Sequence, residues 1–102
     1  MKRVIIDQIE CTLSGVIQVR FSKQLLDDEI IEKFEYVRGL LEPGVSVSAF
    51  IEAYNAYFAS QLPAYPPVDA DSVERLTRIV NVEHTENVVM ARKAFLASLE
   101  TL

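Results

Sequence analysis

Residues 11 to 19, Cys-Thr-Leu-Ser-Gly-Val-Ile-Gln-Val, decide the fold of the first half of the chain. Polar and apolar residues alternate on both sides of Gly15, which predicts two antiparallel strands joined by a tight turn. The position of the turn matters, because a shift of one residue moves every side chain of a strand to the other face of the sheet. The length of the loop therefore determines which residues form the apolar face.

A three-residue loop at residues 13–15 accounts for the pattern better than a two-residue loop at residues 14–15. The shorter loop places Gln18 and Arg20 on the same face as Ile9 and Cys11, and so interrupts the apolar face. The longer loop puts its glycine at the left-handed position with which such loops commonly end. It predicts the pairs Cys11–Ile17, Ile9–Val19 and Asp7–Phe21 on one face, and Glu10–Gln18 and Gln8–Arg20 on the other.

A second turn is predicted at Asp27-Asp28, between two further β-rich runs. With these two residues in the turn, Arg20 lies opposite Glu35 and Lys23 opposite Glu32, which are favourable cross-strand pairs. The first half should then be an antiparallel meander with strands at about residues 4–13, 16–26 and 29–41. Its apolar face would hold Ile9, Cys11, Ile17, Val19, Phe21, Leu25, Ile30, Phe34 and Tyr36, with Leu25 opposite Ile30, Phe21 opposite Phe34 and Val19 opposite Tyr36.

The second half predicts three helices that cover the apolar face of this sheet. Apolar residues recur at steps of three and four over residues 47–62, after a serine near the start of the run. The proline-rich residues 63–67 end this helix and form a stiff extended connection. Asp71 should cap a second helix in a capping box with Glu74, and Thr85 should cap a third. The helices span about residues 47–62, 72–82 and 86–100, so the chain is a single α+β domain over residues 1–102.

The composition excludes several classes of protein. Hydrophobic residues make up 50% and charged residues 25% of the 102 residues, values typical of a globular chain rather than a disordered one. The single cysteine excludes an internal disulfide. The net charge of −5 disfavours binding to nucleic-acid phosphates, and no run approaches the roughly 20 apolar residues of a membrane span. We therefore expect a cytoplasmic protein that binds neither nucleic acid nor membranes.

No residue pattern in the chain supports catalysis, a cofactor or a metal. His84 is the only histidine and has no second histidine or suitable cysteine to accompany it, so we interpret it as solvated or locally bonded between two helices. Cys11 falls on the predicted apolar face, where a free cysteine acts as a small hydrophobic residue rather than a nucleophile. Asp69, Asp71 and Glu74 lack the spacing of a calcium loop. No catalytic, cofactor-binding or metal-binding residue is therefore predicted.

Aromatic residues give the strongest indication of a binding surface. Five of the nine aromatic residues lie within residues 50–65, and those on one helix face are expected to cover the sheet: Phe50, Tyr54 and Phe58. Tyr57 and Tyr65 are the better interface candidates, because tyrosine is enriched where one end of a side chain stays in water. The adjoining prolines add a rigid strip, so the predicted interface consists of Tyr57, Tyr65, Pro66 and Pro67.

Six short motifs are spread along most of the chain. They are Ser14-Gly15-Val16-Ile17-Gln18-Val19-Arg20-Phe21, Lys23-Gln24, Asp27-Asp28, Tyr36-x-Arg38, Glu42-Pro43-Gly44-Val45 and Val82-Glu83-His84-Thr85. As a set they resemble a group of small proteins of tailed bacteriophages and prophages, typically encoded near tail genes. The chain departs from that group in having Asp27-Asp28 where the group has Asp-Gly, and in lacking a tryptophan in the last helical region. The resemblance implies an accessory or virion-assembly role that depends on surfaces rather than on a catalytic site.

The leading hypothesis is a non-enzymatic phage protein, either a small tail or baseplate component or an assembly factor, that acts through protein–protein contacts. Its partners would be phage structural proteins or further copies of the chain, bound at an exposed sheet edge or at the Tyr57–Tyr65 surface, in the host cytoplasm or within the virion. The alternative is an acidic phage-encoded inhibitor that binds a host protein, such as a defence or nucleic-acid enzyme, which requires carboxylates gathered on one face. A third class, a small hydrolase or ligand-binding module, requires a polar pocket around His84.

Overall fold

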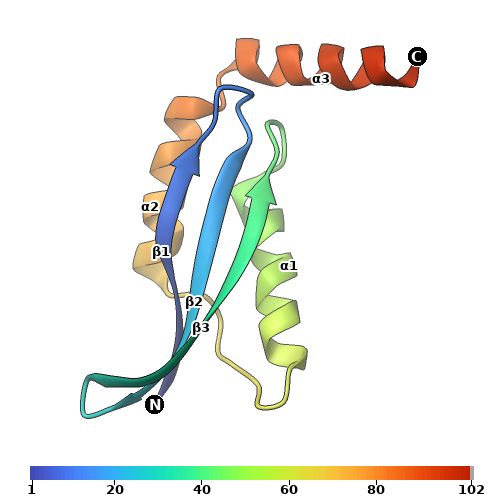
Figure 1. Ribbon diagram of the computed structural model, residues 1–102. Coiled ribbons are helices and arrows are strands. Elements are labelled where there is room, and N and C mark those ends of the chain that lie inside the picture. The colour runs from blue at the N-terminus through green and yellow to red at the C-terminus, as the bar shows by residue number, and fades with distance from the viewer. Residues whose placement is uncertain (102) are drawn as a thin grey trace.

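Three strands and three helices follow one another along the chain, in the order that the sequence predicts (Figure 1). The computed structural model describes residues 1–101. The elements are β1 (Lys2–Cys11), β2 (Ile17–Asp27), β3 (Ile30–Leu41), α1 (Val47–Ser60), α2 (Ala70–Glu83) and α3 (Glu86–Glu100). The strands form one antiparallel sheet in the order β1-β2-β3, so the predicted α+β fold class is confirmed.

The three-residue loop between β1 and β2 is confirmed. The Thr12 backbone N–H donates to the Val16 carbonyl at 3.2 Å, and the Gly15 N–H donates to the Thr12 carbonyl at 3.0 Å. Gly15 has a φ of 87°, in the left-handed region that glycine adopts without strain. The structure contains the predicted pairs Cys11–Ile17, Glu10–Gln18, Ile9–Val19 and Gln8–Arg20.

One predicted pair of this hairpin is wrong, because β1 contains a bulge at Asp7. Phe21 faces Ile6 rather than Asp7, and the register shifts between Ile6 and Gln8. A bulge leaves one residue of a strand unpaired, so the apolar positions before and after it are out of phase by one residue. The Asp7 carboxylate meets Arg20, whose guanidinium donates to both carboxylate oxygens at 2.9 and 3.0 Å.

The outer edge of β1 is closed by the segment that leads into α2. The Asp69 N–H donates to the Val4 carbonyl at 2.9 Å. The Ile6 N–H donates to the Ser72 hydroxyl at 3.0 Å, and the Arg75 guanidinium donates to the Ile6 carbonyl. Because these backbone groups already have partners, this edge of the sheet is not available to a further strand.

Replacing Ser72 by alanine is expected to lower the free energy of unfolding by about 1–3 kcal/mol, because it leaves the buried Ile6 N–H without an acceptor. Urea unfolding followed by circular dichroism measures the loss. Ser48→Ala is the matched control: Ser48 is exposed on α1, and its replacement should change the stability by less than about 0.5 kcal/mol. Equal effects of the two substitutions would show that the Ser72 hydroxyl does not support the edge of β1.

The turn between β2 and β3 lies one residue later than predicted. Its central residues are Asp28 and Glu29, whereas Asp27 pairs with Ile30. Both central residues have positive φ values, 48° and 69°. Two-residue hairpin turns favour such values because the backbone twist of the turn then matches that of the strands.

The face that β3 presents to the core is also corrected. A bulge at Glu32 follows the turn, since Leu26 faces Ile31 whereas Leu25 faces Lys33. Together the turn and the bulge shift the register of β3 by an odd number of residues, which reverses its faces. The observed pairs are Phe21–Val37, Lys23–Glu35, Arg20–Arg38 and Val19–Gly39, in place of the predicted Phe21–Phe34, Lys23–Glu32, Arg20–Glu35 and Val19–Tyr36. The predicted core residues Ile30, Phe34 and Tyr36 are exposed instead.

Helices α1 and α2 pack on one face of the sheet and form the core with it (Figure 1). Phe21, fully buried in the middle of β2, lies against three rings of α1. Its ring centre is 5.9 Å from that of Phe50, 4.6 Å from Tyr54 and 5.5 Å from Phe58, so the predicted aromatic cover is confirmed. The other core residues are Val4, Ile6, Ile17, Val19, Leu41, Ile51, Val68, Leu76 and Val80.

The helix caps follow the sequence at two of the three helices. The side chains of Ser46 and Thr85 accept backbone hydrogen bonds at the starts of α1 and α3. The cap of α2 is Asp69 rather than the predicted Asp71, and its carboxylate accepts from the Ser72 N–H at 2.9 Å. Asp71 lies in the first turn instead, where a carboxylate is favourable because of the helix dipole.

Helix α3 does not cover the sheet. It crosses the end that carries the β1–β2 loop and extends away from the other elements (Figure 1). None of the residues Glu86–Glu100 is buried. The first half of the helix is held by Arg92, whose guanidinium donates to the Glu42 carboxylate at 2.7 and 3.1 Å. The predicted helical cover of the sheet therefore consists of α1 and α2.

The projecting helix makes the molecule elongated. Its extents are 52 × 26 × 19 Å and its radius of gyration is 15.6 Å, compared with about 13 Å for a compact chain of this length. The accessible surface is 6783 Å², whereas about 5800 Å² is typical of a folded monomer of this mass. The chain thus exposes roughly 1000 Å² that a compact monomer of equal mass would bury.

Candidate protein-interaction surface

Strand β3 exposes a row of hydrophobic side chains. The exposed fractions are 69% for Ile30, 44% for Ile31, 60% for Phe34 and 40% for Tyr36, and we call these four residues the β3 patch. The rings of Phe34 and Tyr36 lie 5.2 Å apart. Ile31, Phe34 and Tyr36 share one face of the strand, whereas Ile30, which pairs with Asp27, lies on the other face at the tip of the hairpin. Single exposed hydrophobic residues are common on protein surfaces, but several on one strand indicate a contact site.

Charged side chains border the β3 patch. The Arg20 guanidinium carbon lies 4.0 Å from the centre of the Tyr36 ring while the same group is bonded to Asp7. The hydrogen bond with Asp7 raises the pKa of Arg20, so the guanidinium stays charged. Arg38 lies directly across from Arg20 in the sheet and has no ion-pair partner within residues 1–101. A cation therefore remains free beside the patch.

Two hollows lie beside this strand. The larger, of about 680 Å³, is lined by Gln8, Glu10, Gln18, Val19, Arg20, Arg38, Gly39, Leu40 and Tyr54. The smaller, of about 470 Å³, lies between β3 and α1. Burial, and to a lesser extent Tyr57, raise the pKa of Tyr54, so its hydroxyl stays protonated at neutral pH. The amide, guanidinium and phenol groups that line the larger hollow can form hydrogen bonds with a peptide. His84 lines neither hollow.

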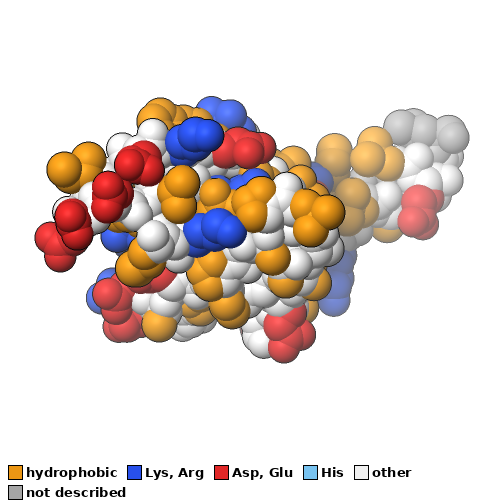
Figure 2. Space-filling view, turned by 90° about the horizontal axis from the view of Figure 1, so that it is seen from below, with side chains coloured by type: hydrophobic (Ala, Val, Ile, Leu, Met, Phe, Trp, Pro, Cys, Tyr) orange, Lys and Arg blue, Asp and Glu red, His pale blue; other side chains and the backbone are white. Residues whose placement is uncertain are grey.

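The four residues of the predicted interface do not form one surface. Tyr57 is exposed on α1 and borders the smaller hollow beside Val37. Tyr65 packs against the core, with the Lys23 ammonium 4.9 Å from the centre of its ring. Pro66 and Pro67 are exposed in the segment between α1 and α2. Figure 2, the view from below, shows hydrophobic side chains over much of that face of the molecule. The structure thus places Tyr57 beside β3 and turns Tyr65 inward, and the interface role of these residues stays a prediction.

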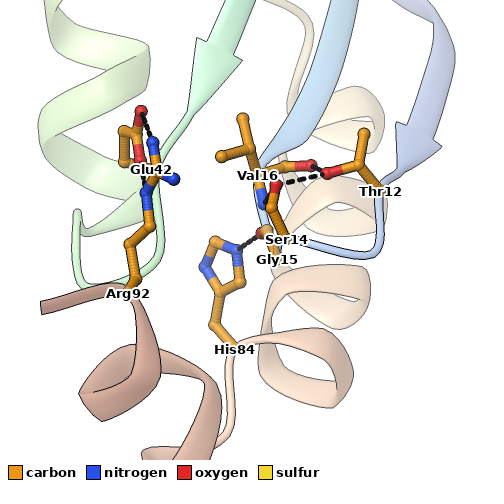
Figure 3. A network of polar contacts seen from close by, with 7 residues as sticks. All are labelled: Thr12, Ser14, Gly15, Val16, Glu42, His84 and Arg92. Carbon is orange, nitrogen blue, oxygen red and sulfur yellow. Dashed lines mark hydrogen bonds and ion pairs between the residues drawn. The ribbon is translucent and has the colours of Figure 1, made fainter. Parts of the chain in front are cut away.

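His84 lies at the junction of α2 and α3, as the sequence predicts, but it is neither solvated nor locally bonded, because its partner is 69 residues away in the chain (Figure 3). Its Nε2 lies 2.6 Å from the Gly15 carbonyl oxygen, and because a carbonyl only accepts, Nε2 is the donor. Its Nδ1 is buried and has no hydrogen-bond partner within residues 1–101. In the same loop, the Thr12 hydroxyl donates to the Val16 carbonyl at 2.6 Å. The histidine therefore ties the end of α2 to the β1–β2 loop.

Cys11 is exposed, so the prediction that it fills the core is wrong. It does lie opposite Ile17, but at the end of the edge strand β1, close to the last residue of α2. Partial burial of the thiol and the nearby Glu83 carboxylate raise the pKa of Cys11. Because only the thiolate is a strong nucleophile, this thiol is weakly reactive at neutral pH despite its exposure.

The β3 patch is the functional feature that the sequence did not reveal. Strict alternation along residues 29–41 favoured a register in which Phe34 and Tyr36 faced inward. The adjacent Ile30 and Ile31 break that alternation, and they are the one signal that could have indicated an irregularity next to the turn.

Within residues 1–101, no group of three or more His, Cys, Asp or Glu side chains is arranged to hold a metal ion. None of the helices in this part of the chain is long and apolar enough to cross a membrane. The candidate contact surface consists of the exposed hydrophobic residues of the β3 patch and of α3. Comparison of the chain with protein-family models, with curated proteins and with solved structures finds no match.

Proposed function

We propose that the protein is a non-enzymatic component of a tailed-phage particle, or a factor in the assembly of its tail or baseplate, and that it acts through protein–protein contacts. The motifs shared with small phage proteins support the phage setting. The observation that supports the contact role is α3, a helix that is held at one end and presents apolar side chains beyond the sheet.

Four apolar side chains and one arginine form a stripe along one face of α3. The α3 stripe consists of Val88, Arg92, Phe95, Leu96 and Leu99, which recur at helical spacing. Its first part contacts the body of the protein, since Val88 packs against Gly15 and Arg92 is bonded to Glu42. Its second part, Phe95, Leu96 and Leu99, is exposed. The same row of residues therefore begins as an internal contact and continues as a free surface.

The partner that fits the exposed part of the stripe is an apolar groove on a phage structural protein. Amphipathic helices bind such grooves through anchors three, four and seven residues apart, the spacing at which Phe95 and Leu99 continue from Arg92. The ion pair between Arg92 and Glu42 fixes the direction of the helix before binding. Docking a helix that is already ordered costs less conformational entropy than ordering one on binding.

The experiment introduces Leu99→Asp into the phage or prophage genome that encodes the chain. Quantitative mass spectrometry of purified particles measures incorporation of the protein, and plaque counts measure the infective titre. Loss of an apolar anchor should reduce one or both at least about tenfold. Particles that lack the wild-type protein, together with a normal titre after deletion of its gene, would contradict the proposal.

Met90→Asp is the matched control for this experiment. Met90 is exposed on the same helix and precedes Leu99 by nine residues. Nine residues at about 100° each amount to two and a half turns, so Met90 lies on the side of α3 opposite the stripe. The control should leave incorporation and titre within about twofold of wild type. Equal losses in the two variants would show that the stripe is not the docking face.

One observation favours the second candidate, an acidic inhibitor of a host protein. Asp27, Asp28, Glu29 and Glu32 are exposed at the tip of the β2–β3 hairpin, which extends beyond the helices (Figure 1), and Figure 2 shows carboxylates gathered along one side. Binding of a basic host protein to this tip should weaken steeply as salt is raised, whereas docking through the apolar α3 stripe should not. Retention of purified host partners at low and high salt separates the two candidates.

A further inference from the structure

The two edges of the sheet differ in how they end. On β1, the backbone groups of Val4 and Ile6 are bonded to Asp69, Ser72 and Arg75. On β3, no strand pairs with the other side within residues 1–101, because the sheet order ends there. One edge of the sheet is thus closed by the protein's own chain, and the other presents a twelve-residue strand with free backbone groups.

The open edge lacks most of the features with which soluble proteins protect such strands. β3 contains no proline, and Lys33 is its only lysine. A bulge is present at Glu32, but it lies within the β3 patch and does not separate the patch from the edge. A long edge strand with exposed apolar side chains and unpaired backbone groups is a template for pairing with another strand.

We propose that β3 pairs antiparallel with β3 of a second copy of the chain, so that two sheets join into one of six strands across a two-fold axis. This pairing goes beyond the phage setting and does not depend on it. In a two-fold interface, if one residue faces another, the reverse contact also occurs. When the two-fold axis is normal to the sheet, two residues directly opposite each other point their side chains to the same side of the sheet. The axis then passes beside one residue of β3, which lies opposite the same residue of the second copy.

Charge excludes three residues from the axis and favours Phe34. Centring the pair on Lys33, Glu35 or Arg38 would place like charges directly opposite each other, which is unfavourable. Centring it on Phe34 places Lys33 opposite the partner's Glu35, and the symmetry repeats this ion pair on the other side of the axis. The Glu35 carboxylate is exposed and lies 3.4 Å from Lys23, so it would accept from two ammonium groups.

The bulge makes the same register favourable for the apolar residues. Because Glu32 is the unpaired residue of β3, it takes no position of its own in the ladder. Tyr36 then faces the partner's Ile31, and Val37 faces the partner's Ile30. Every member of the β3 patch thereby lies opposite an apolar residue, which is favourable in an antiparallel pair.

The exposed area of the chain agrees with a dimer. The surface exceeds that of a typical monomer of this mass by roughly 1000 Å². A standard protein–protein interface removes about 800 Å² from each partner. The excess is comparable to the surface that one partner contributes to an interface of ordinary size, and both the β3 patch and the exposed part of α3 contribute to it.

Size-exclusion chromatography with light scattering on the full chain tests the association, and the expected mass is twice the 11.5 kDa of the monomer. Lys33→Glu should raise the dissociation constant of the dimer at least about tenfold, because it places acidic residues opposite each other. Glu35→Lys should do the same, and the double exchange Lys33→Glu/Glu35→Lys should restore the wild-type value within about threefold. Circular dichroism verifies the fold of each variant; both side chains are exposed.

Disulfide formation tests the residue on the axis. Phe34→Cys in a Cys11→Ser background should oxidise to a covalent dimer, because facing residues of antiparallel strands have Cα atoms about 4.5–5.5 Å apart, within disulfide range. Leu40→Cys is the matched control: Leu40 is exposed on the same strand and the same face, but lies away from its own copy in this register. It should stay monomeric on a non-reducing gel.

Two results would overturn the pairing. The first is a monomer at all micromolar concentrations. The second is a dimer that tolerates Lys33→Glu and cross-links no faster through position 34 than through position 40. Leu99→Asp should leave the dimer intact, so a failure of the α3 docking proposal and a failure of the β3 pairing can be told apart. A dimer lost in Leu99→Asp alone would place the interface on α3 and contradict the pairing.

Discussion

Replacing Phe58 by alanine is expected to lower the free energy of unfolding by about 3–5 kcal/mol. The Phe58 side chain is fully buried, and its ring meets that of Phe21 edge to face at 5.5 Å. Truncation removes the transfer free energy of the ring, leaves a cavity between α1 and β2, and removes an aromatic contact. The free energy of unfolding of a typical domain is about 5–15 kcal/mol, so this loss is a large fraction of it. Urea unfolding followed by circular dichroism measures it.

Tyr57→Ala is the control for this substitution. Tyr57 precedes Phe58 on the same helix and has a ring of similar size, but about half of it is exposed. Its loss should cost about 1 kcal/mol or less, because little buried area disappears. Losses of equal size in the two variants would mean that α1 does not pack on the sheet through Phe58.

Replacing Gly39 by alanine is expected to destabilise the fold by about 1–3 kcal/mol, because the strand and the helix touch at this residue. A Cβ atom on Gly39 would lie 2.7 Å from the Cζ atom of Tyr54 and closer still to its hydroxyl oxygen. The Tyr54 ring cannot retreat easily, since Phe21 and Phe50 lie against it with centroid distances of 4.6 and 5.0 Å. Thermal or urea unfolding measures the loss.

A double-mutant cycle identifies the cause of that loss. In a Tyr54→Ala background, Gly39→Ala should cost almost nothing, since the ring that the new methyl group meets is gone. The coupling free energy between the two sites should therefore be about 1–3 kcal/mol and opposite in sign to the single-mutant loss. Additive losses would show that Gly39 matters for its backbone and not for the close approach of Tyr54.

The first hairpin and the helices could be predicted from the sequence because their signals are local. Gly15 at the end of a three-residue loop fixes the register of β1 and β2 near the turn. The caps Ser46 and Thr85 mark the starts of α1 and α3. The cap of α2 was placed two residues late, because Asp69 and Asp71 offer equal capping chemistry and only the contacts of β1 with the helix distinguish them.

Both errors in the sheet come from bulges. At Asp7 the unpaired residue is polar and is followed by the polar Gln8, so the pattern of apolar residues does not reveal which of the two is unpaired. The bulge at Glu32 follows a turn that lies at Asp28 and Glu29. The backbone conformation of these two residues decides where the turn lies, and the residue types alone do not reveal it. An odd shift then exposed Phe34 and Tyr36, which is why the candidate surface was placed on Tyr57 and Tyr65 instead.

The position of α3 could not be predicted, because amphipathic spacing says which face of a helix is apolar and not what covers it. The ion pair that holds the helix joins Arg92 to Glu42, fifty residues earlier in the chain. The contact of His84 with Gly15 likewise spans 69 residues. Neither pairing leaves a trace in local sequence, whereas each is needed to direct the helix away from the sheet.

The closed edge of β1 sets a limit on how many copies of the chain can join. Strands that pair edge to edge form open-ended fibres when both edges of a sheet are free, and closed pairs when only one is. The residues that close β1 lie far along the chain, 66 residues away for Ser72 and 69 for Arg75. Because synthesis begins at the N-terminus, a sheet formed by β1–β3 during synthesis has two free edges until α2 has been made. Once α2 has folded, β3 is the sheet edge that stays open within residues 1–101, so the pairing that we propose would stop at two copies.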